Sequence, residues 1–264
     1  METRPARIPQ IRPAFVGMGL ALLLVVLSLN LNPCPANDLF WQLRAGREIA
    51  ATHLPPTRDA YSWTRPGTPW VVHEWLAFAA LWAAYAGSGG FAGVWLLQAT
   101  LVCATFALLF ARLLRETEGA PLTGFLLAVG AALVASAFFQ PRPHLFSYLF
   151  LVLTVGLVSS VRRQETDGRR LWGLVPLFAL WANLHAGVLV GVAVLALFAL
   201  GDALEGALLT ARDDPARQDR LRQAGRLGLV AAACGAATLA TPYGPKLYHN
   251  FGATLSNQTA MNSV

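Results

Sequence analysis

The chain has 264 residues and a formal net charge of +6, with 55% hydrophobic and only 13% charged residues. The charged share is about half of that in an ordinary globular protein. This composition excludes a soluble enzyme, a disordered chain and a disulfide-rich scaffold. Six stretches contain no charged residue: 14–31, 75–111, 119–141, 145–161, 171–201 and 227–245. Apolar runs of about 18 residues or more are typical of membrane-spanning helices and exclude an outer-membrane barrel, whose strands are shorter and alternate in polarity.

Four basic clusters set the predicted topology. They lie at residues 4–12, 112–115, 162–170 and 212–226 and hold 14 of the 20 Lys and Arg residues. Because cytoplasmic loops of membrane proteins are enriched in Arg and Lys, the positive charge is explained without a nucleic-acid partner. The excess of Arg over Lys indicates a GC-rich bacterial genome. We therefore predict a multi-pass protein of the bacterial inner membrane, with a cytoplasmic N-terminus and an active face on the periplasmic or extracellular side.

The first predicted span covers residues 14–31. A signal peptide also follows basic residues, but its apolar region is usually about 7–15 residues long and ends at a small-residue cleavage site. The sequence NPCP at 32–35 is a poor cleavage site. We therefore expect the span to be retained.

Residues 32–90 form the predicted first outer loop, with two helices lying on the membrane surface. The first covers 38–51 and can be capped by Asn37 or Asp38. Its predicted apolar stripe contains Leu39, Leu43, Ile49 and Ala50, opposite Arg44, Arg47 and Glu48. The second covers 71–86, begins near His73 and Glu74, and carries aromatic residues that favour the headgroup level of a membrane.

The remaining spans are predicted at 91–111, 121–139 and 145–161, as a pair within 171–201 broken at 183–187, and at 227–241. If all four basic clusters are cytoplasmic, the chain must cross the membrane an even number of times between neighbouring clusters, so the run at 171–201 must contain two spans. The predicted fold class is all-α, a polytopic membrane helical bundle of about seven transmembrane helices plus two interfacial helices in the first outer loop. We assign residues 1–264 to a single transmembrane domain. All five histidines fall on its outer side, which indicates that the chemistry lies there.

Several motifs carry a resemblance that extends over nearly the whole chain. They are DLFWQLRAG at 38–46, DAYSW at 59–63, PWVVHEWL at 69–76, RPHLFSY at 142–148, WANLHAG at 181–187 and TPYG at 241–244. These motifs resemble bacterial polytopic proteins grouped with the GT-C glycosyltransferases. Two positions depart from the pattern: Gln42 stands where members often carry His, and Asn37-Asp38 replaces a paired acidic signature.

The resemblance implies a function. GT-C enzymes transfer sugars from polyprenyl-phosphate carriers, and an acidic residue in their first outer loop is catalytic. Asp38 matches that residue. Members place juxtamembrane helices in this loop and usually have more than seven spans. The chain therefore resembles the N-terminal part of such a protein, and we expect it to be incomplete at its C-terminus.

Asp38 is the predicted catalytic base, because sugar transfer requires a group that accepts the proton of the acceptor hydroxyl. The alternative role is a helix N-cap. His73 and Glu74 are predicted to orient the acceptor, with capping or metal binding beside Asp38 as alternatives. No metal ligand or cofactor is assigned, and a divalent metal stays open.

Further substrate-binding residues are predicted at the outer edge. Arg142 and His144 lie in a Pro-flanked turn, and a guanidinium matches the oxygens of a leaving phosphate; an interfacial Arg snorkelling to water is the alternative. His185 breaks an apolar run together with Asn183, where helix packing is the alternative. Tyr243 and Lys246 complete the predicted set.

The function predicted from the sequence is a membrane glycosyltransferase that moves a sugar from a polyprenyl-phosphate donor to an acceptor at the outer face of the inner membrane. The expected partners are this donor, a lipid, glycan or protein acceptor, and membrane lipids. Two alternatives remain open. The first is a transporter or lipid-carrier flippase, which would carry polar residues at mid-span and paired repeats. The second is a non-catalytic membrane assembly subunit, which would tolerate loss of Asp38.

Overall fold

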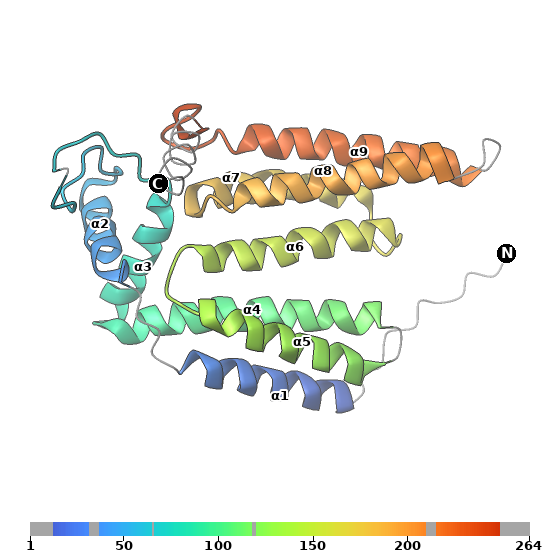
Figure 1. Cartoon of the computed structure of the whole chain (residues 1–264), viewed down its shortest axis with the longest axis horizontal. Helices are drawn as coiled ribbons and strands as arrows, with labels where there is room; N and C mark the ends of the chain where they lie inside the picture. Colours follow the sequence, from blue (N-terminus) through green and yellow to red (C-terminus); the bar gives the residue numbers. More distant parts are fainter. Residues whose placement is uncertain (1–12, 32–36, 65, 118–119, 210–214, 249–264) are drawn as a thin grey trace, which may run out of the picture. The chain divides into compact units, whose positions relative to one another are not determined.

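The structure is a computed structural model that describes residues 13–31, 37–64, 66–117, 120–209 and 215–248 (Figure 1). These residues are predominantly helical and contain no β-strand. Their α-helices are α1 (Pro13–Asn30), α2 (Leu39–Thr52), α3 (Trp75–Ser88), α4 (Phe91–Glu116), α5 (Pro121–Ala135), α6 (His144–Arg162), α7 (Leu174–Leu184), α8 (Val188–Leu204) and α9 (Pro215–Ala237). The predicted all-α fold class is confirmed.

Five helical segments among the described residues are long and apolar enough to cross a membrane. They are Pro13–Asn30, Phe91–Glu116, Pro121–Phe138, His144–Arg162 and Val188–Leu208. Each agrees with a span predicted from an uncharged run, because a helix in lipid satisfies every backbone hydrogen bond within itself. The protein is therefore a membrane protein built as a helical bundle.

The two other predicted crossings fall on helices without an apolar stretch long enough to cross a membrane. The predicted break at 183–187 is confirmed, since α7 ends at Leu184 and α8 begins at Val188. However, α7 has only 11 residues and follows a six-residue 3-10 helix, Gly168–Gly173. In α9 the apolar part begins only after Arg226. The length of α7 and the apolar length of α9 are both below the roughly 20 residues of a regular membrane span. The prediction of seven transmembrane helices therefore stays a prediction.

The chain divides into two compact units. The first contains α1, the part of α4 from Ala99 onward, and α5. Within it α1 contacts α5, and two edge-to-face aromatic pairs join its elements: Phe106 with Phe139 at 5.8 Å and Phe110 with Phe125 at 6.3 Å between ring centroids. Such pairs stabilise packing where lipid and protein are equally apolar.

The second unit contains α2, α3, the first turns of α4, and α6 to α9. In this unit α6, α7, α8 and α9 run side by side, and α2 and α3 lie together at one end of them (Figure 1). Its core is apolar and includes Phe178 and Trp181 of α7, Leu195 of α8 and Leu227 of α9, all at most 1% exposed. The apolar core fixes the four helices, and their connections bring polar side chains to the two ends.

The two predicted surface helices are α2 and α3. Leu43 and Ile49 of α2 are buried as expected, and Arg44, Arg47 and Glu48 are exposed. Ala50, which belongs to the predicted apolar stripe, is exposed, and Gly46 is buried. The reason is a close approach of the two helices, since a Cβ added at Gly46 would overlap the carbonyl oxygen of Phe78 and lie 2.8 Å from Trp82 Cβ.

Substitution of Gly46 by Ala should destabilise the second unit by about 1–3 kcal/mol, because the added methyl group overlaps backbone that cannot move without separating α2 from α3. The measurement is thermal unfolding in detergent, followed by circular dichroism. Gly87→Ala is the matched control. An added Cβ there meets nothing within 4 Å, so this variant should be at least as stable as the wild type. Equal stability of the two variants would contradict the close approach.

Candidate functional site

Polar residues from the segment that contains α2 and α3 and from two helix connections meet at one end of the second unit. We call this the histidine end and define it by Asp38, Glu74, Arg142, His144 and His185. The first contact is an ion pair, in which Arg142 NH2 lies 2.9 Å from Asp38 Oδ2. Asp38 and Arg142, which are far apart in sequence, are therefore in direct contact. The two side chains are 42% and 36% exposed, so the pair is accessible to a ligand.

The side chain of Asp38 does not cap α2. Asp38 occupies the N-cap position, but no hydrogen bond from its carboxylate to a first-turn N–H is present. Instead Oδ2 pairs with Arg142, and Oδ1 accepts a hydrogen bond of 3.2 Å from Trp41 Nε1. The carboxylate therefore joins the connection before α6, through Arg142, to a side chain of α2, through Trp41.

Arg142 retains a hydrogen-bonding group without a partner. Its Nε is buried and has no hydrogen-bond partner among the described residues. A buried, unsatisfied N–H is costly unless an oxygen ligand accepts from it. The guanidinium presents several donors in one plane, the geometry that matches phosphate or carboxylate oxygens. Arg142 is therefore equipped to bind an anion while it contacts Asp38.

Glu74 is the centre of a second cluster. It occupies the N-cap position of α3 without a side-chain capping bond. Its Oε1 lies 3.6 Å from His73 Nε2 and 3.5 Å from His185 Nε2, and the Glu74 side chain is only 16% exposed. The predicted capping role of Glu74 is therefore not what its carboxylate does. A single carboxylate instead faces two imidazole rings.

The hydrogen bonds around His185 fix its proton. Its Nδ1 accepts from the backbone N–H of Gly187 at 2.9 Å, and Ser147 Oγ lies 2.7 Å from the same atom. Ser147 Oγ in turn accepts from Trp181 Nε1 at 2.7 Å, so the serine proton is directed to His185. A nitrogen that accepts from an amide carries no proton, and the neutral ring is therefore protonated on Nε2. That N–H faces Glu74.

Burial is the main cause that lowers the pKa of His185, and the neighbouring His144 and His73 lower it further, while Glu74 opposes them. The two hydrogen bonds that Nδ1 accepts also favour the neutral form of His185, since protonation of this nitrogen would remove the acceptor. His185 is therefore a neutral hydrogen-bond donor toward Glu74 at pH 7. It does not act as a fixed cation.

His144 joins the two clusters. It begins α6, two residues after Arg142, and its ring centroid lies 6.4 Å from that of His185. Tyr243 lies beside the second cluster, where its hydroxyl oxygen accepts a 3.0 Å hydrogen bond from the N–H of Val72. Lys246 is exposed, and none of the described residues forms an ion pair with it. The structure thus brings six of the seven predicted binding residues close to one another or to Asp38, whereas Lys246, within the described part of the chain, contacts the set only through the bond of its backbone N–H to the carbonyl of Tyr243.

Three residues of the histidine end escaped the sequence analysis: Trp41, Ser147 and Trp181. Ser147 follows His144 by three positions, so helical spacing places both on one face of α6, and this signal was available. Trp41 and Trp181 carried no such signal, because an aromatic residue at helical spacing is usually part of a core. Their indole N–H groups bond Asp38 and Ser147.

Asn183 has the structural role that the sequence left open. Its Nδ2 donates to the carbonyl oxygens of Ala179 and Ala240, both at 2.8 Å, and its Oδ1 accepts from Trp75 Nε1 at 2.7 Å. One amide therefore ties α3, α7 and the turn after α9 together. This contact holds the start of α3, and with it Glu74, against the bundle.

Charged residues also meet at the opposite end of the second unit, which we call the arginine end and define by Arg162, Asp202, Glu205 and Arg220. Asp202 is fully buried and lies 2.7 Å from Arg162 NH2, and Arg220 NH2 lies 3.1 Å from Glu205. Removing one partner of such a pair leaves an uncompensated buried charge. The arginine end therefore joins α6, α8 and α9 as a structural clamp.

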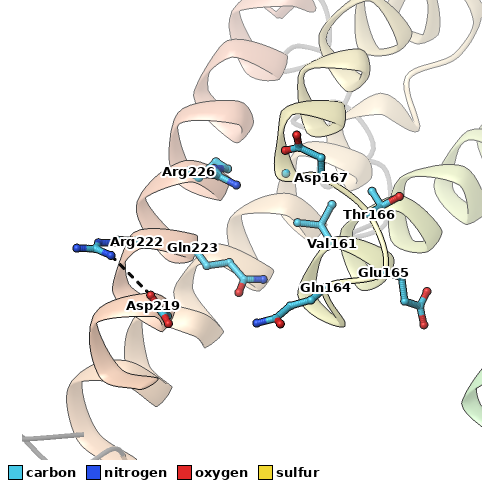
Figure 2. Close-up of a pocket in the computed structure, with 10 residues that line it drawn as sticks. Val161, Gln164, Glu165, Thr166, Asp167, Asp219, Arg222, Gln223 and Arg226 are labelled. Carbon is cyan, nitrogen blue, oxygen red and sulfur yellow. Dashed lines mark ion pairs between the residues drawn. The ribbon is translucent and has the colours of Figure 1, made fainter. Parts of the chain in front are cut away.

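A pocket of about 580 Å³ opens at the arginine end, between the connection that follows α6 and the start of α9 (Figure 2). Its charged lining residues are Glu165, Asp167, Asp219, Arg222 and Arg226. Asp219 and Arg222, marked as an ion pair in Figure 2, lie 3.7 Å apart and are largely exposed. The volume of this pocket exceeds the roughly 250 Å³ of a second pocket, which is lined by Trp41 and Trp70. Asp219 pairs with Arg222, and Asp167 accepts a hydrogen bond from the N–H of Arg169, so both carboxylates have local partners.

No group of three or more His, Cys, Asp or Glu side chains that could hold a metal ion occurs among the described residues. Comparison of the chain with protein-family models, with curated proteins and with solved structures yields no match. The resemblance in the sequence motifs therefore remains an expectation. Any functional assignment has to rest on the geometry of the histidine end.

The lowered pKa of His185 predicts a pH dependence of stability. The unfolded chain takes up a proton near pH 6.5, the ordinary histidine pKa, whereas the folded chain does so only at lower pH. Stability from this group is thus fully present above pH 6.5 and is lost as the pH falls from 6.5 to the folded pKa. The measurement is the unfolding midpoint in detergent between pH 5 and 8.

The His185→Asn variant should lose less stability than the wild type over this pH window. His53→Asn, which removes an exposed imidazole at the end of α2, controls for the loss of a histidine as such. The interpretation fails if the wild type and His185→Asn lose stability in parallel as the pH falls.

Proposed function

We propose that this protein is a membrane glycosyltransferase that moves a sugar from a polyprenyl-phosphate donor to an acceptor at the membrane surface. The observation that carries the proposal is the pair of Asp38 with Arg142, whose N–O distance is 2.9 Å. It combines a carboxylate that does not cap its helix with a guanidinium that has an unsatisfied N–H. A transferase of this class needs one group to take a proton and one to receive a phosphate.

Asp38 acts as the base in this proposal. Its carboxylate accepts the proton of the acceptor hydroxyl while the acceptor oxygen forms a bond to the anomeric carbon of the donor. The bond from the anomeric carbon to the phosphate oxygen breaks, and its electron pair leaves with the polyprenyl phosphate. The product is the glycosylated acceptor, and the proton later passes from Asp38 to water.

Arg142 receives the leaving phosphate. Charge builds up on the phosphate oxygen as the glycosidic bond breaks, and a guanidinium stabilises that charge through charge-assisted hydrogen bonds. In the absence of donor the same guanidinium pairs with Asp38. A bound phosphate competes for Arg142, which releases the carboxylate for proton transfer. The two roles are therefore coupled through one ion pair.

Glu74 and His185 serve the acceptor in this proposal. The bonds from Ser147 and Gly187 direct the Nε2–H of His185 toward Glu74, so the carboxylate is oriented without capping α3. An oriented carboxylate beside a neutral imidazole offers an acceptor and a donor for sugar hydroxyl groups. His73 and His144 flank this arrangement.

The membrane setting of the proposal is the bacterial inner membrane, with the histidine end at the outer face and the arginine end in the cytoplasm. The support is the distribution of charge. The loops around the arginine end contain most of the Arg residues of the second unit, which is typical of cytoplasmic loops. A polyprenyl-phosphate sugar in the outer leaflet would place its phosphate at the headgroup level, where Arg142 is expected.

Asp38→Asn should lower sugar transfer by about 10²- to 10⁴-fold, because the amide cannot accept the hydroxyl proton. The variant should fold, since a half-exposed ion pair contributes only about 0–1 kcal/mol. Arg142→Lys should be less severe, as the charge remains and the planar fork is lost. The assay is turnover of a polyprenyl-phosphate sugar by the full-length protein in proteoliposomes, with each variant quantified.

Asp219→Asn is the matched control for Asp38→Asn. It neutralises the carboxylate of another Asp–Arg pair, which is exposed and lies at the arginine end. This variant should retain wild-type turnover. Full activity of Asp38→Asn would remove its role as the base and favour the transporter or assembly alternatives.

The proposed orientation is tested by labelling in whole cells with a membrane-impermeant maleimide. In a background without Cys34, Cys103 and Cys234, a cysteine in place of exposed Ala60 should be labelled from outside. One in place of exposed Arg169 should react only after the membrane is permeabilised. Labelling of the Arg169→Cys variant from outside would reverse the orientation.

A further inference from the structure

A small pocket with aromatic walls lies in the second unit, next to Asp38. It has a volume of about 250 Å³ and is lined by Trp41, Asp59, Tyr61, Ser62 and Trp70. Trp41 belongs to α2, and the other four residues belong to the connection between α2 and α3. None of the functional roles assigned above uses this pocket.

The connection that forms the pocket is held by its own backbone. Residues Arg58 and Pro69 form an antiparallel bridge. The N–H of Asp59 donates to Thr68 O at 2.9 Å, and the N–H of Trp70 donates to Thr57 O at 2.9 Å. The two arms of the loop are therefore fixed side by side. The pocket is preformed, which lowers the entropic cost of binding a ligand.

The aromatic rings of Trp41, Tyr61 and Trp70 line the pocket with their planes tilted relative to one another. The centroids of Trp41 and Trp70 lie 5.9 Å apart with planes at 59°, and those of Tyr61 and Trp70 lie 5.6 Å apart at 70°. Tyr61 is further held by a 3.1 Å hydrogen bond from its hydroxyl to Glu48. Because the rings do not stack face to face, they leave apolar ring surface for a ligand.

Polar groups stand beside these walls. The Oδ1 atom of Asp59 accepts from the N–H groups of Tyr61 at 2.8 Å and Ser62 at 2.9 Å, so the carboxylate is fixed in place. A hydrogen bond from the side chain of Ser62, together with these two backbone bonds, lowers the pKa of Asp59, which is therefore ionised at pH 7. The pocket thus offers flat apolar surface, a carboxylate and the hydroxyl of Ser62 in one small space.

A pyranose has the complementary chemistry, with apolar C–H faces and a rim of hydroxyl groups. An alkyl chain gains nothing from the carboxylate. A quaternary ammonium group would use the rings and the carboxylate but not the serine hydroxyl, and it is smaller than this space. The volume is just below that of pockets for drug-sized ligands, which suits one sugar unit.

Trp41 connects the pocket to Asp38, since its ring forms a wall and its Nε1–H donates to Asp38 Oδ1 at 3.2 Å. We propose that the pocket formed by Trp41, Asp59, Tyr61, Ser62 and Trp70 binds one pyranose unit of the saccharide that reacts at Asp38. This inference deepens the proposed function and rests on it for the identity of the substrate. Trp70 and Trp41 take the C–H faces of the sugar, and Asp59 accepts from its hydroxyl groups.

The test is saturable binding of methyl glycosides to the full chain in phosphatidylethanolamine–phosphatidylglycerol nanodiscs, measured by saturation-transfer NMR. The probes are methyl glucoside, galactoside, mannoside and N-acetylglucosaminide. Trp70→Ala should weaken the best of them by about tenfold or more, because an aromatic face and its buried area are lost. Trp63→Ala is the matched control, as Trp63 lies in the same loop, is 97% exposed and does not line the pocket.

Ser62→Leu keeps the proposal testable if Trp70→Ala fails to fold. Ser62 is exposed, and a leucine there would fill the pocket without removing a core residue; binding should again fall. The proposal is overturned if the wild type binds no methyl glycoside, if both variants bind like the wild type, or if Trp63→Ala loses binding equally. Binding of choline in place of the glycosides would also overturn it and assign the pocket to a cation.

Binding and turnover separate this proposal from the proposed function. Loss of turnover in Asp38→Asn together with wild-type binding and turnover in Trp70→Ala and Ser62→Leu would refute the pocket alone. Saccharide binding that depends on Trp70, in a wild-type protein without transferase activity, would refute the catalytic function and keep the pocket.

Discussion

The amide of Asn183 is the contact on which the arrangement of the histidine end depends. It lies where the long apolar run must break, and its hydrogen bonds join a carbonyl of α7, a carbonyl of the turn after α9 and the indole N–H of Trp75. Buried polar groups without a hydrogen-bond partner are costly, because no water replaces the missing partner. By bonding Trp75, the same amide fixes the first residue of α3. Glu74 and His73 therefore stand beside the connection that carries His185.

A second constraint is the absence of a side chain at two glycines. Gly46 lets α2 lie directly against the backbone of α3. Gly187 places its N–H against His185 Nδ1, and a Cβ there would overlap Ser147 Oγ and lie 2.8 Å from Nδ1. In both places the backbone itself takes part in the packing. The loop helices and the imidazole are thereby held in one geometry.

The two ends of the second unit use charge in different ways. At the arginine end, Asp202 is fully buried, and its ion pair with Arg162 joins α8 to α6. At the histidine end, Asp38 and Arg142 remain partly exposed, and the Asp38 carboxylate does not cap α2. A buried pair resists exchange because separating it leaves a charge in a medium of low dielectric constant. An exposed pair can exchange partners with a ligand, which is what a reaction site requires.

The sequence by itself determined five apolar helices long enough to cross a membrane, the break at 183–187 and the two helices between the first two of these, because the length and polarity of each segment dictate its own hydrogen bonding and burial. It also selected Asp38, Glu74, Arg142 and His185 as residues of interest. Only the tertiary structure decided which of them meet. The way the loop folds back over α6 to α9 decides three features. They are the direction of the Asp38 carboxylate, the bond between Ser147 and His185, and the aromatic rings around Trp70. That fold is set by contacts between residues distant in sequence, and no local periodicity records them.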